Sequence, residues 1–279
     1  MQNEEQREFW SDKVGDIWVN RRAAMDIKLA PVLEALLERA AIREGEQILD
    51  IGCGAGTSSF EAAQRTGPKG HVIGADISET LLADARARAT GYPNVRFDNC
   101  DAQTHDFAPE SVDLIMSRFG VMFFADPPAA FVNMARALKP GGRMVFATWG
   151  SIGENPFFTM PAAVSKTVLG PRDRTDPDAP GPFALRDIDR VKGILNGAPL
   201  AEIKAEEVPV TLTPPGTAED VAALMCQIGP AHSALNHFDA DEAQRRALME
   251  ALIDALDPYV TAGGVCIPGL INMFSARKG

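Results

Sequence analysis

One segment constrains this chain more than any other, the run Ile48-Leu49-Asp50-Ile51-Gly52-Cys53-Gly54-Ala55-Gly56-Thr57. An apolar strand leads into three glycines at alternate positions, and a segment of helical character follows. Glycines allow the backbone to pass close to a ligand, because a Cβ would block the approach. The N–H groups at the start of the helix then face the negative or polar atoms of the ligand. The pattern predicts the nucleotide-binding corner of a doubly wound α/β domain.

The glycine spacing indicates which nucleotide is bound. The dinucleotide pattern G-x-G-x-x-G needs a third glycine where this chain has Thr57. The strand also carries an acid, Asp50, just before the turn. The sequence D-I-G-C-G-A-G-T strongly resembles motif I of the class I S-adenosylmethionine (SAM)-dependent methyltransferases. This resemblance implies a cofactor site at Asp50, Gly52, Cys53, Gly54 and Thr57.

A second acid supports this interpretation. The run from Gly70 to Ser78 is expected to form the next strand and to end at Asp76. A parallel neighbouring strand would bring this carboxylate beside the glycine turn, where its two oxygens match the two donors of a ribose diol. It would repel the 2′-phosphate of NADP. We expect Asp76 and Ile77 to contact the cofactor, since Ser78 already serves as the N-cap of the following helix.

Two further strand ends carry candidate residues. In class I methyltransferases, an acid after the third strand binds around the adenine amino group, and the next residue packs on the ring. Asp101 and Ala102 match that arrangement, with an ordinary Asx turn as the alternative. Ser117, Arg118 and Phe119 end the fourth strand, at the edge where ligands bind in parallel sheets. We expect this loop to face the reacting methyl group.

Strand and helix patterns alternate from residue 47 to residue 149, which predicts a mostly parallel sheet covered on both faces. The expected strands are 47–51, 71–76, 94–98, 112–117 and 143–149, with helices at about 56–66, 78–90 and 127–138. Asp126-Pro127-Pro128 resembles the D/N-P-P-Y/F signature of enzymes that methylate amide or adenine nitrogens, but lies too far from the strand end. It fits a helix start with Asp126 as N-cap. The family resemblance implies a Rossmann-like sheet of seven strands, the last antiparallel, at about 265–276.

The chain divides into four expected regions. These are an N-terminal helical lid segment (1–40), the SAM-binding core (41–150), a mainly helical cap and substrate region (151–258) with one core strand near 201–212, and the final core strand (259–279). Ten of the 20 prolines lie between 151 and 216, which favours an inserted cap over a plain linker. Helices are expected at about 188–196, 218–228 and 240–256, the last two separated by Gly229-Pro230. In the N-terminal region, Pro31 is expected in a first helical turn.

The arrangement looks most like the quinone-biosynthesis-type group of small-molecule methyltransferases. This predicts in-line transfer of a methyl group from SAM to a small, largely apolar acceptor in an enclosed pocket. The aromatic residues of the N-terminal segment either pack on the domain surface or close over the cofactor. His232 is the candidate general base, and catalytic residues are otherwise unknown. The expected pocket residues are Trp18, Arg118, Phe119, Phe123, Trp149 and His232.

Composition excludes several classes of partner. The formal net charge of −11 argues against nucleic acid or an anionic membrane, since both need a basic face. The polar, acidic N-terminus does not resemble a targeting signal, and no apolar run approaches membrane-spanning length, so a cytoplasmic protein without membrane insertion is expected. The four cysteines and four histidines show no metal-ligand spacing, which predicts metal independence.

Two other functions share part of this pattern. A nicotinamide-dependent oxidoreductase would have the same corner and ribose acid, but would need glycine in place of Thr57. A non-catalytic SAM-binding regulatory protein would keep the motifs of residues 47–117 and lack an enclosed acceptor cavity. The sequence leaves open the acceptor, the atom that is methylated and the oligomeric state.

Overall fold

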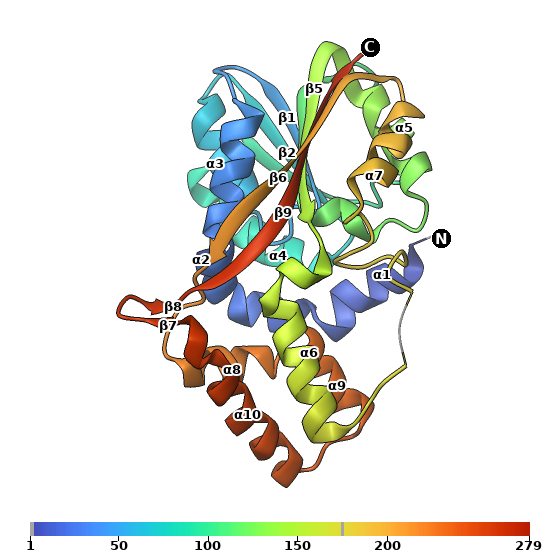
Figure 1. Ribbon diagram of the computed structural model, residues 1–279. Helices are drawn as coiled ribbons and strands as arrows, with labels where there is room; N and C mark the ends of the chain where they lie inside the picture. The colour runs from blue at the N-terminus through green and yellow to red at the C-terminus, as the bar shows by residue number, and fades with distance from the viewer. Residues whose placement is uncertain (1–2, 174–175) are drawn as a thin grey trace.

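A seven-stranded sheet forms the centre of the protein in the computed structural model, which describes residues 3–173 and 176–279 (Figure 1). The strand order is β3-β2-β1-β4-β5-β9-β6. β9 runs antiparallel to both of its neighbours, and the pairs from β3 to β5 are parallel. The predicted fold class is therefore confirmed. The strands are β1 (Gln47–Ile51), β2 (His71–Asp76), β3 (Val95–Asn99), β4 (Val112–Arg118), β5 (Leu138–Trp149), β6 (Leu200–Leu212) and β9 (Ile267–Lys278).

Helices cover the two faces of the sheet according to the direction in which the chain winds. From β1 the chain moves outward through α3 (Thr57–Thr66) and α4 (Glu79–Arg88), and both pack with α2 (Gly15–Ala40). From β4 it winds the other way through α5 (Pro127–Ala137), which packs with α7 (Ile188–Asn196) on the opposite face. Because such crossovers are right-handed, the reversal between β1 and β4 creates the switch point at which α/β proteins bind ligands.

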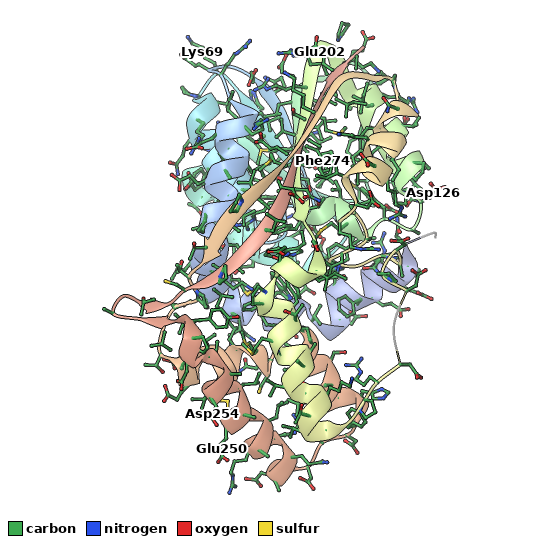
Figure 2. The ribbon with its side chains drawn as sticks, viewed as in Figure 1. Lys69, Asp126, Glu202, Glu250, Asp254 and Phe274 are labelled. Carbon is green, nitrogen blue, oxygen red and sulfur yellow. The ribbon has the colours of Figure 1, made fainter. Side chains whose placement is uncertain are left out.

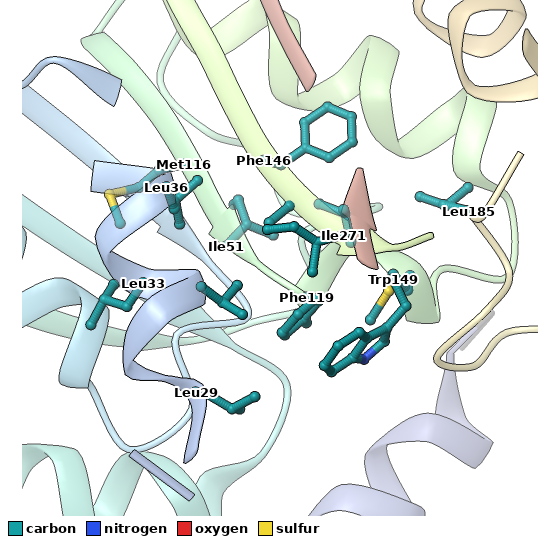
Figure 3. Packing of buried hydrophobic residues seen from close by; sticks show 14 of the residues in the cluster. Leu29, Leu33, Leu36, Ile51, Met116, Phe119, Phe146, Trp149, Leu185 and Ile271 are labelled. Carbon is teal, nitrogen blue, oxygen red and sulfur yellow. The ribbon is translucent and has the colours of Figure 1, made fainter. Parts of the chain in front are cut away.

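The core between α2 and the sheet positions this switch point. Leu29, Leu33 and Leu36 recur at helical spacing on α2 and face Ile51 and Met116 of β1 and β4 (Figure 3). All five are buried, and burying each such side chain contributes about 1.5–3 kcal/mol. The C-terminal ends of β1 and β4 are therefore held rigidly against α2.

A helical cap lies beyond the C-terminal edge of the sheet (Figure 1). Its helices contact one another and come from two separate parts of the chain. They are α6 (Pro156–Leu169), which follows β5, and α8 (Ala218–Met225), α9 (Gly229–His237) and α10 (Glu242–Leu256), which follow β6. The short elements are α1 (Glu4–Glu8), η1 (Phe9–Lys13), η2 (Ala89–Gly91), η3 (Gly120–Phe123), η4 (Ile152–Glu154), η5 (Asp257–Tyr259), β7 (Val260–Thr261) and β8 (Gly264–Val265).

Prolines account for the main differences from the sequence prediction. α6 and α9 were not expected, yet Pro156 and Pro230 lie in their first turns, where a missing N–H costs nothing. Pro31 does not begin a helix but lies inside α2, and Pro161 lies inside α6. An interior proline costs roughly 3 kcal/mol, which tertiary packing of these helices offsets.

Two local predictions are confirmed. The Ser78 hydroxyl accepts the Leu81 N–H at the start of α4, and Asp126 accepts the Ala129 N–H at the start of α5. Within the described part of the chain, no helix is long and apolar enough to cross a membrane.

Candidate active site at the sheet edge

The three glycines after β1 have different structural roles. All have positive φ, at 65°, 55° and 85° for Gly52, Gly54 and Gly56. A Cβ on Gly52 would lie 2.5 Å from the Cα of Gly120, so this glycine lets the β1 and β4 loops touch. A Cβ on Gly56 would lie 2.7 Å from the ring of Phe97. Of the three, only Gly54 would have room for a Cβ, whose nearest neighbour would be the Leu81 side chain at 3.9 Å.

Asp50 secures the start of α3 from inside the sheet. Its Oδ2 accepts hydrogen bonds from the hydroxyls of Ser58 and Ser59, at 2.6 and 2.7 Å. Its Oδ1 is buried and has no hydrogen-bond partner among the described residues. Burial raises the pKa of Asp50 to about 6, against the effect of the serine hydroxyls. An acceptor atom is therefore left for a donor that the described residues do not supply.

Asp76 lies at the end of β2 beside the glycine turn. Its carboxylate accepts the N–H of Gly54 at 2.7 Å and that of Ser78 at 2.8 Å. Each carboxylate oxygen keeps lone pairs for further donors, and 8% of the residue is exposed. Burial raises the pKa of Asp76, and the two N–H groups oppose that rise. Ile77 continues the chain between Asp76 and Ser78.

The cysteine thiols near this corner are in surroundings that make them unreactive. Burial raises the pKa of the Cys53 thiol well above its usual range, and that of Cys100 to about 12. A neutral thiol is a poor nucleophile. Both residues fill tight corners beside Asp76.

A residue that the sequence did not single out, Asn3, covers Asp101. Its Nδ2 donates to both oxygens of the Asp101 carboxylate, at 3.0 and 2.9 Å, and its Oδ1 accepts the Ala125 N–H at 2.9 Å. Asp101 also accepts the N–H of Gln103, which forms a turn around the buried Ala102. The N-terminal end of the chain is thereby fastened to the loops after β3 and η3.

The rest of the N-terminal segment crosses the ends of the parallel strands. Ser78 and Thr80 donate from their hydroxyls to the carbonyls of Trp10 and Ser11, at 2.9 and 2.7 Å. The Trp10 ring lies edge-on to Trp18 and to Phe123, with centroids 5.5 and 5.1 Å apart. The segment from Asn3 to Trp18 therefore lies over the ends of β2 and β3 and against η3.

Aromatic rings continue from the end of β4 into the cap. Phe119 has φ 70°, a left-handed conformation that is unfavourable for a bulky side chain. It stacks on Trp149, with ring centroids 4.4 Å apart (Figure 3). The Trp149 ring also contacts that of Phe158 of α6, with centroids 5.1 Å apart. The Ser117 hydroxyl donates to the Ile51 carbonyl and accepts the Gly120 N–H, which fixes this loop.

Two buried cations, Arg118 of β4 and Lys28 of α2, lie close enough to affect each other electrostatically. Arg118 has an ion-pair partner in Asp26 of α2 at 3.7 Å, while its Nη1 is buried without a hydrogen-bond partner in the described chain. Asp26 in turn accepts the hydroxyl of Thr57 at 2.9 Å. Lys28 of α2 is 3% exposed, and its Nζ lies 3.7 Å from the ring centroid of Phe157. Lys28 could not be singled out from the sequence, since a lone lysine in a helix usually faces solvent.

His232 lies on α9. Its Nδ1 lies 3.2 Å from the Cys226 carbonyl, and its Nε2 lies 3.0 Å from the Asn236 side-chain nitrogen. Both ring nitrogens thus have partners within the cap, and the base role of His232 stays a prediction. Among residues 3–173 and 176–279, no three histidine, cysteine or acidic side chains gather to hold a metal ion.

A cavity of about 730 Å³ lies elsewhere, lined by residues from the starts of β1, β2 and β4, including Gln47, His71 and Val112. Ligands of parallel sheets bind at the opposite, C-terminal edge. We therefore place the candidate site at Gly54, Asp76 and Phe119 and not in this cavity.

Comparison with known proteins indicates the class of the domain. Residues 42–169 match the family model described as "Methyltransferase domain". Aklanonic acid methyltransferase of Streptomyces is 40% identical over 37% of this chain and 48% of its own length. A ubiquinone/menaquinone biosynthesis C-methyltransferase of Cellvibrio japonicus is 37% identical over 39% of this chain and 45% of its own. The matches thus span about half the length of these relatives.

The solved structures show the same fold. Phosphoethanolamine N-methyltransferase 2 of Haemonchus contortus, in complex with SAM, superposes with a TM-score of 0.60 at 21% identity, over 98% of this chain and 59% of that one. The sheet order, the glycine corner and the family match agree. Residues 42–169 therefore carry a methyltransferase domain.

Proposed function

We propose that the protein transfers a methyl group from SAM to a small, largely apolar acceptor held between the sheet edge and the cap. The row of rings Phe119, Trp149 and Phe158 carries this proposal, since it begins at the switch point and continues into α6. Phe119 keeps a strained backbone conformation there, which is a frequent property of ligand-facing residues. The small-molecule methyltransferases among the relatives support the same class of acceptor.

The residues present fit the cofactor. Gly54 leaves room for a ligand, Asp76 has lone pairs for a ribose diol, and the unpartnered Oδ1 of Asp50 can accept a donor such as an amino group. Asp101 and Ala102 would hold the adenine, with Asn3 sharing or yielding the Asp101 carboxylate.

When bound, SAM supplies an electrophilic sulfonium methyl group. The chain's own contribution is to align the acceptor in line with that group and to exclude water. Phe119, Trp149 and the N-terminal segment are placed to do both. The described residues around this site offer no free imidazole as a base, so an acceptor that is already anionic at neutral pH suits it better than an alcohol.

Calorimetry with SAM, S-adenosylhomocysteine, NAD and NADP tests the cofactor assignment. SAM and S-adenosylhomocysteine should bind and the nicotinamides should not. Asp76→Ala should weaken SAM by roughly tenfold or more, because two charge-assisted hydrogen bonds are lost. Binding of NAD, or unchanged SAM affinity in the variant, would show that the assignment is wrong. A wild-type protein that binds SAM but methylates no small molecule would instead favour the regulatory alternative.

A further inference from the structure

The buried cations Lys28 and Arg118 have fewer partners than their position demands. Lys28 belongs to the buried stripe of α2, together with Leu29 and Val32. Its ammonium group lies against the face of the Phe157 ring, 3.7 Å from the centroid. The Arg118 side chain is 14% exposed and leaves Nη1 unpaired. Burying a charged donor without a partner is strongly unfavourable.

The nearby acids do not supply the missing hydrogen-bond partners of Lys28 and Arg118. Asp26 lies 3.7 Å from Arg118, beyond hydrogen-bond distance, and is engaged by Thr57. Asp50 attracts Arg118, but its Oδ2 is bound by two serine hydroxyls, and neither its Oδ1 nor Arg118 Nη1 has a hydrogen-bond partner among the described residues. The two cations also affect each other, because burial, and after it the charge of Arg118, lowers the pKa of Lys28 to about 7. Bound SAM would add its sulfonium charge to the same edge of the sheet.

Their location points to the acceptor. Phe157, over which Lys28 lies, is the neighbour in sequence of Phe158, the ring that contacts Trp149. Arg118 directly precedes Phe119 at the end of β4. Asn155, which begins α6, is fixed to β9 through two hydrogen bonds with Leu270, so this part of the cap is held in place. Rings and cations thus meet between the sheet edge and the first turn of α6.

We propose that Lys28 and Arg118 bind an acidic group, a carboxylate, on the methyl acceptor, while the rings of Phe119, Trp149 and Phe158 bind its apolar part. The inference rests on the proposed methyl transfer and names its substrate class, an apolar carboxylic acid. Charge-assisted hydrogen bonds from a guanidinium and an ammonium are strong and select an anion over its neutral isostere.

Matched neutral and anionic probes test this assignment. Naphthoate and its primary amide are titrated by calorimetry into the protein saturated with S-adenosylhomocysteine. We expect naphthoate to bind at least roughly tenfold more tightly than the amide. Lys28→Met and Arg118→Met should reduce this preference to within about twofold, and Lys28→Arg should retain it. Equal binding of the two probes to the wild type, or no binding of naphthoate, overturns the proposal.

The carboxylate of SAM itself is the other source of the same chemistry. S-adenosylhomocysteine carries that carboxylate and 5′-methylthioadenosine lacks it. If Lys28→Met weakens S-adenosylhomocysteine tenfold, leaves methylthioadenosine unchanged and keeps the naphthoate preference, the cations serve the cofactor and our proposal is wrong. Lys69→Met is the control, since Lys69 is exposed at the opposite end of the molecule from α10 (Figure 2). A wild type that binds no S-adenosylhomocysteine contradicts the proposed function itself, and with it this inference.

Discussion

At the scale of the residue, Lys28 is expected to lower the stability of the free protein. The lysine pKa is 10.5 when unfolded and about 7 when folded, so the unfolded chain binds more protons between these values. The cost is present in full below pH 7 and disappears as the pH rises toward 10.5. Lys28→Met should therefore raise the free energy of unfolding at pH 7. We expect a net gain of about 1–3 kcal/mol, from which the lost cation–π contact with Phe157 is already subtracted.

Urea unfolding at pH 7 and pH 10 measures this change. The gain should shrink at pH 10, whereas the exposed Lys69→Met should have little effect at either pH. An equal gain at both pH values would mean that packing, and not the buried charge near Arg118, is responsible.

Alanine substitutions at Gly52 and Gly141 test whether the glycine corner needs the close contact with Gly120. Both have positive φ, at 65° and 74°, but a Cβ would meet Gly120 at 2.5 Å in the first case and nothing within 4 Å in the second. Gly141→Ala should cost about 1 kcal/mol of strain, and Gly52→Ala at least 2 kcal/mol more, because the two strand ends must separate. Thermal unfolding measures both, and similar losses would contradict the close contact.

At the scale of the element, the N-terminal segment should control access to the cofactor corner. Asn3→Asp places a carboxylate against Asp101, where the amide now donates two hydrogen bonds. We expect faster cleavage near residues 3–18 by protease and roughly tenfold faster dissociation of S-adenosylhomocysteine in stopped-flow measurements. Gln64→Ala, which removes an exposed amide on α3, is the control. Unchanged dissociation would show that the segment does not hold the cofactor.

The helices and strands also show which parts of the fold can be predicted from the sequence. Apolar runs and their turn residues locate the ends of β1, β2 and β4 within one residue, because buried parallel strands have a strong local pattern. α6 and α9 were missed because a proline ends a helix only where its N–H is needed. Asn3 and Lys28 had no local signal. Their roles come from contacts with Asp101 and Phe157, which lie 98 and 129 positions away.

At the scale of the whole molecule, cofactor and acceptor should protect different regions from hydrogen exchange. S-adenosylhomocysteine should protect the N-terminal segment, residues 76–78 and residues 101–103, and leave α10 unchanged, because α10 packs on α6 and α8. Adding naphthoate should extend protection to the first turn of α6 around Phe157. Protection of α10 by the cofactor alone would mean that the cap and the cofactor corner act as one unit.

The origin of the cap helices in two separate parts of the chain has a consequence for recombination between related genes. α6 leaves the sheet after β5, whereas α8, α9 and α10 leave it after β6, and the two groups are in contact with each other. A single recombination event between residues 169 and 218 would join an incoming α6 to resident partners that never packed against it. Exchange of the cap by recombination would therefore need α6 and the helices after β6 to be transferred together.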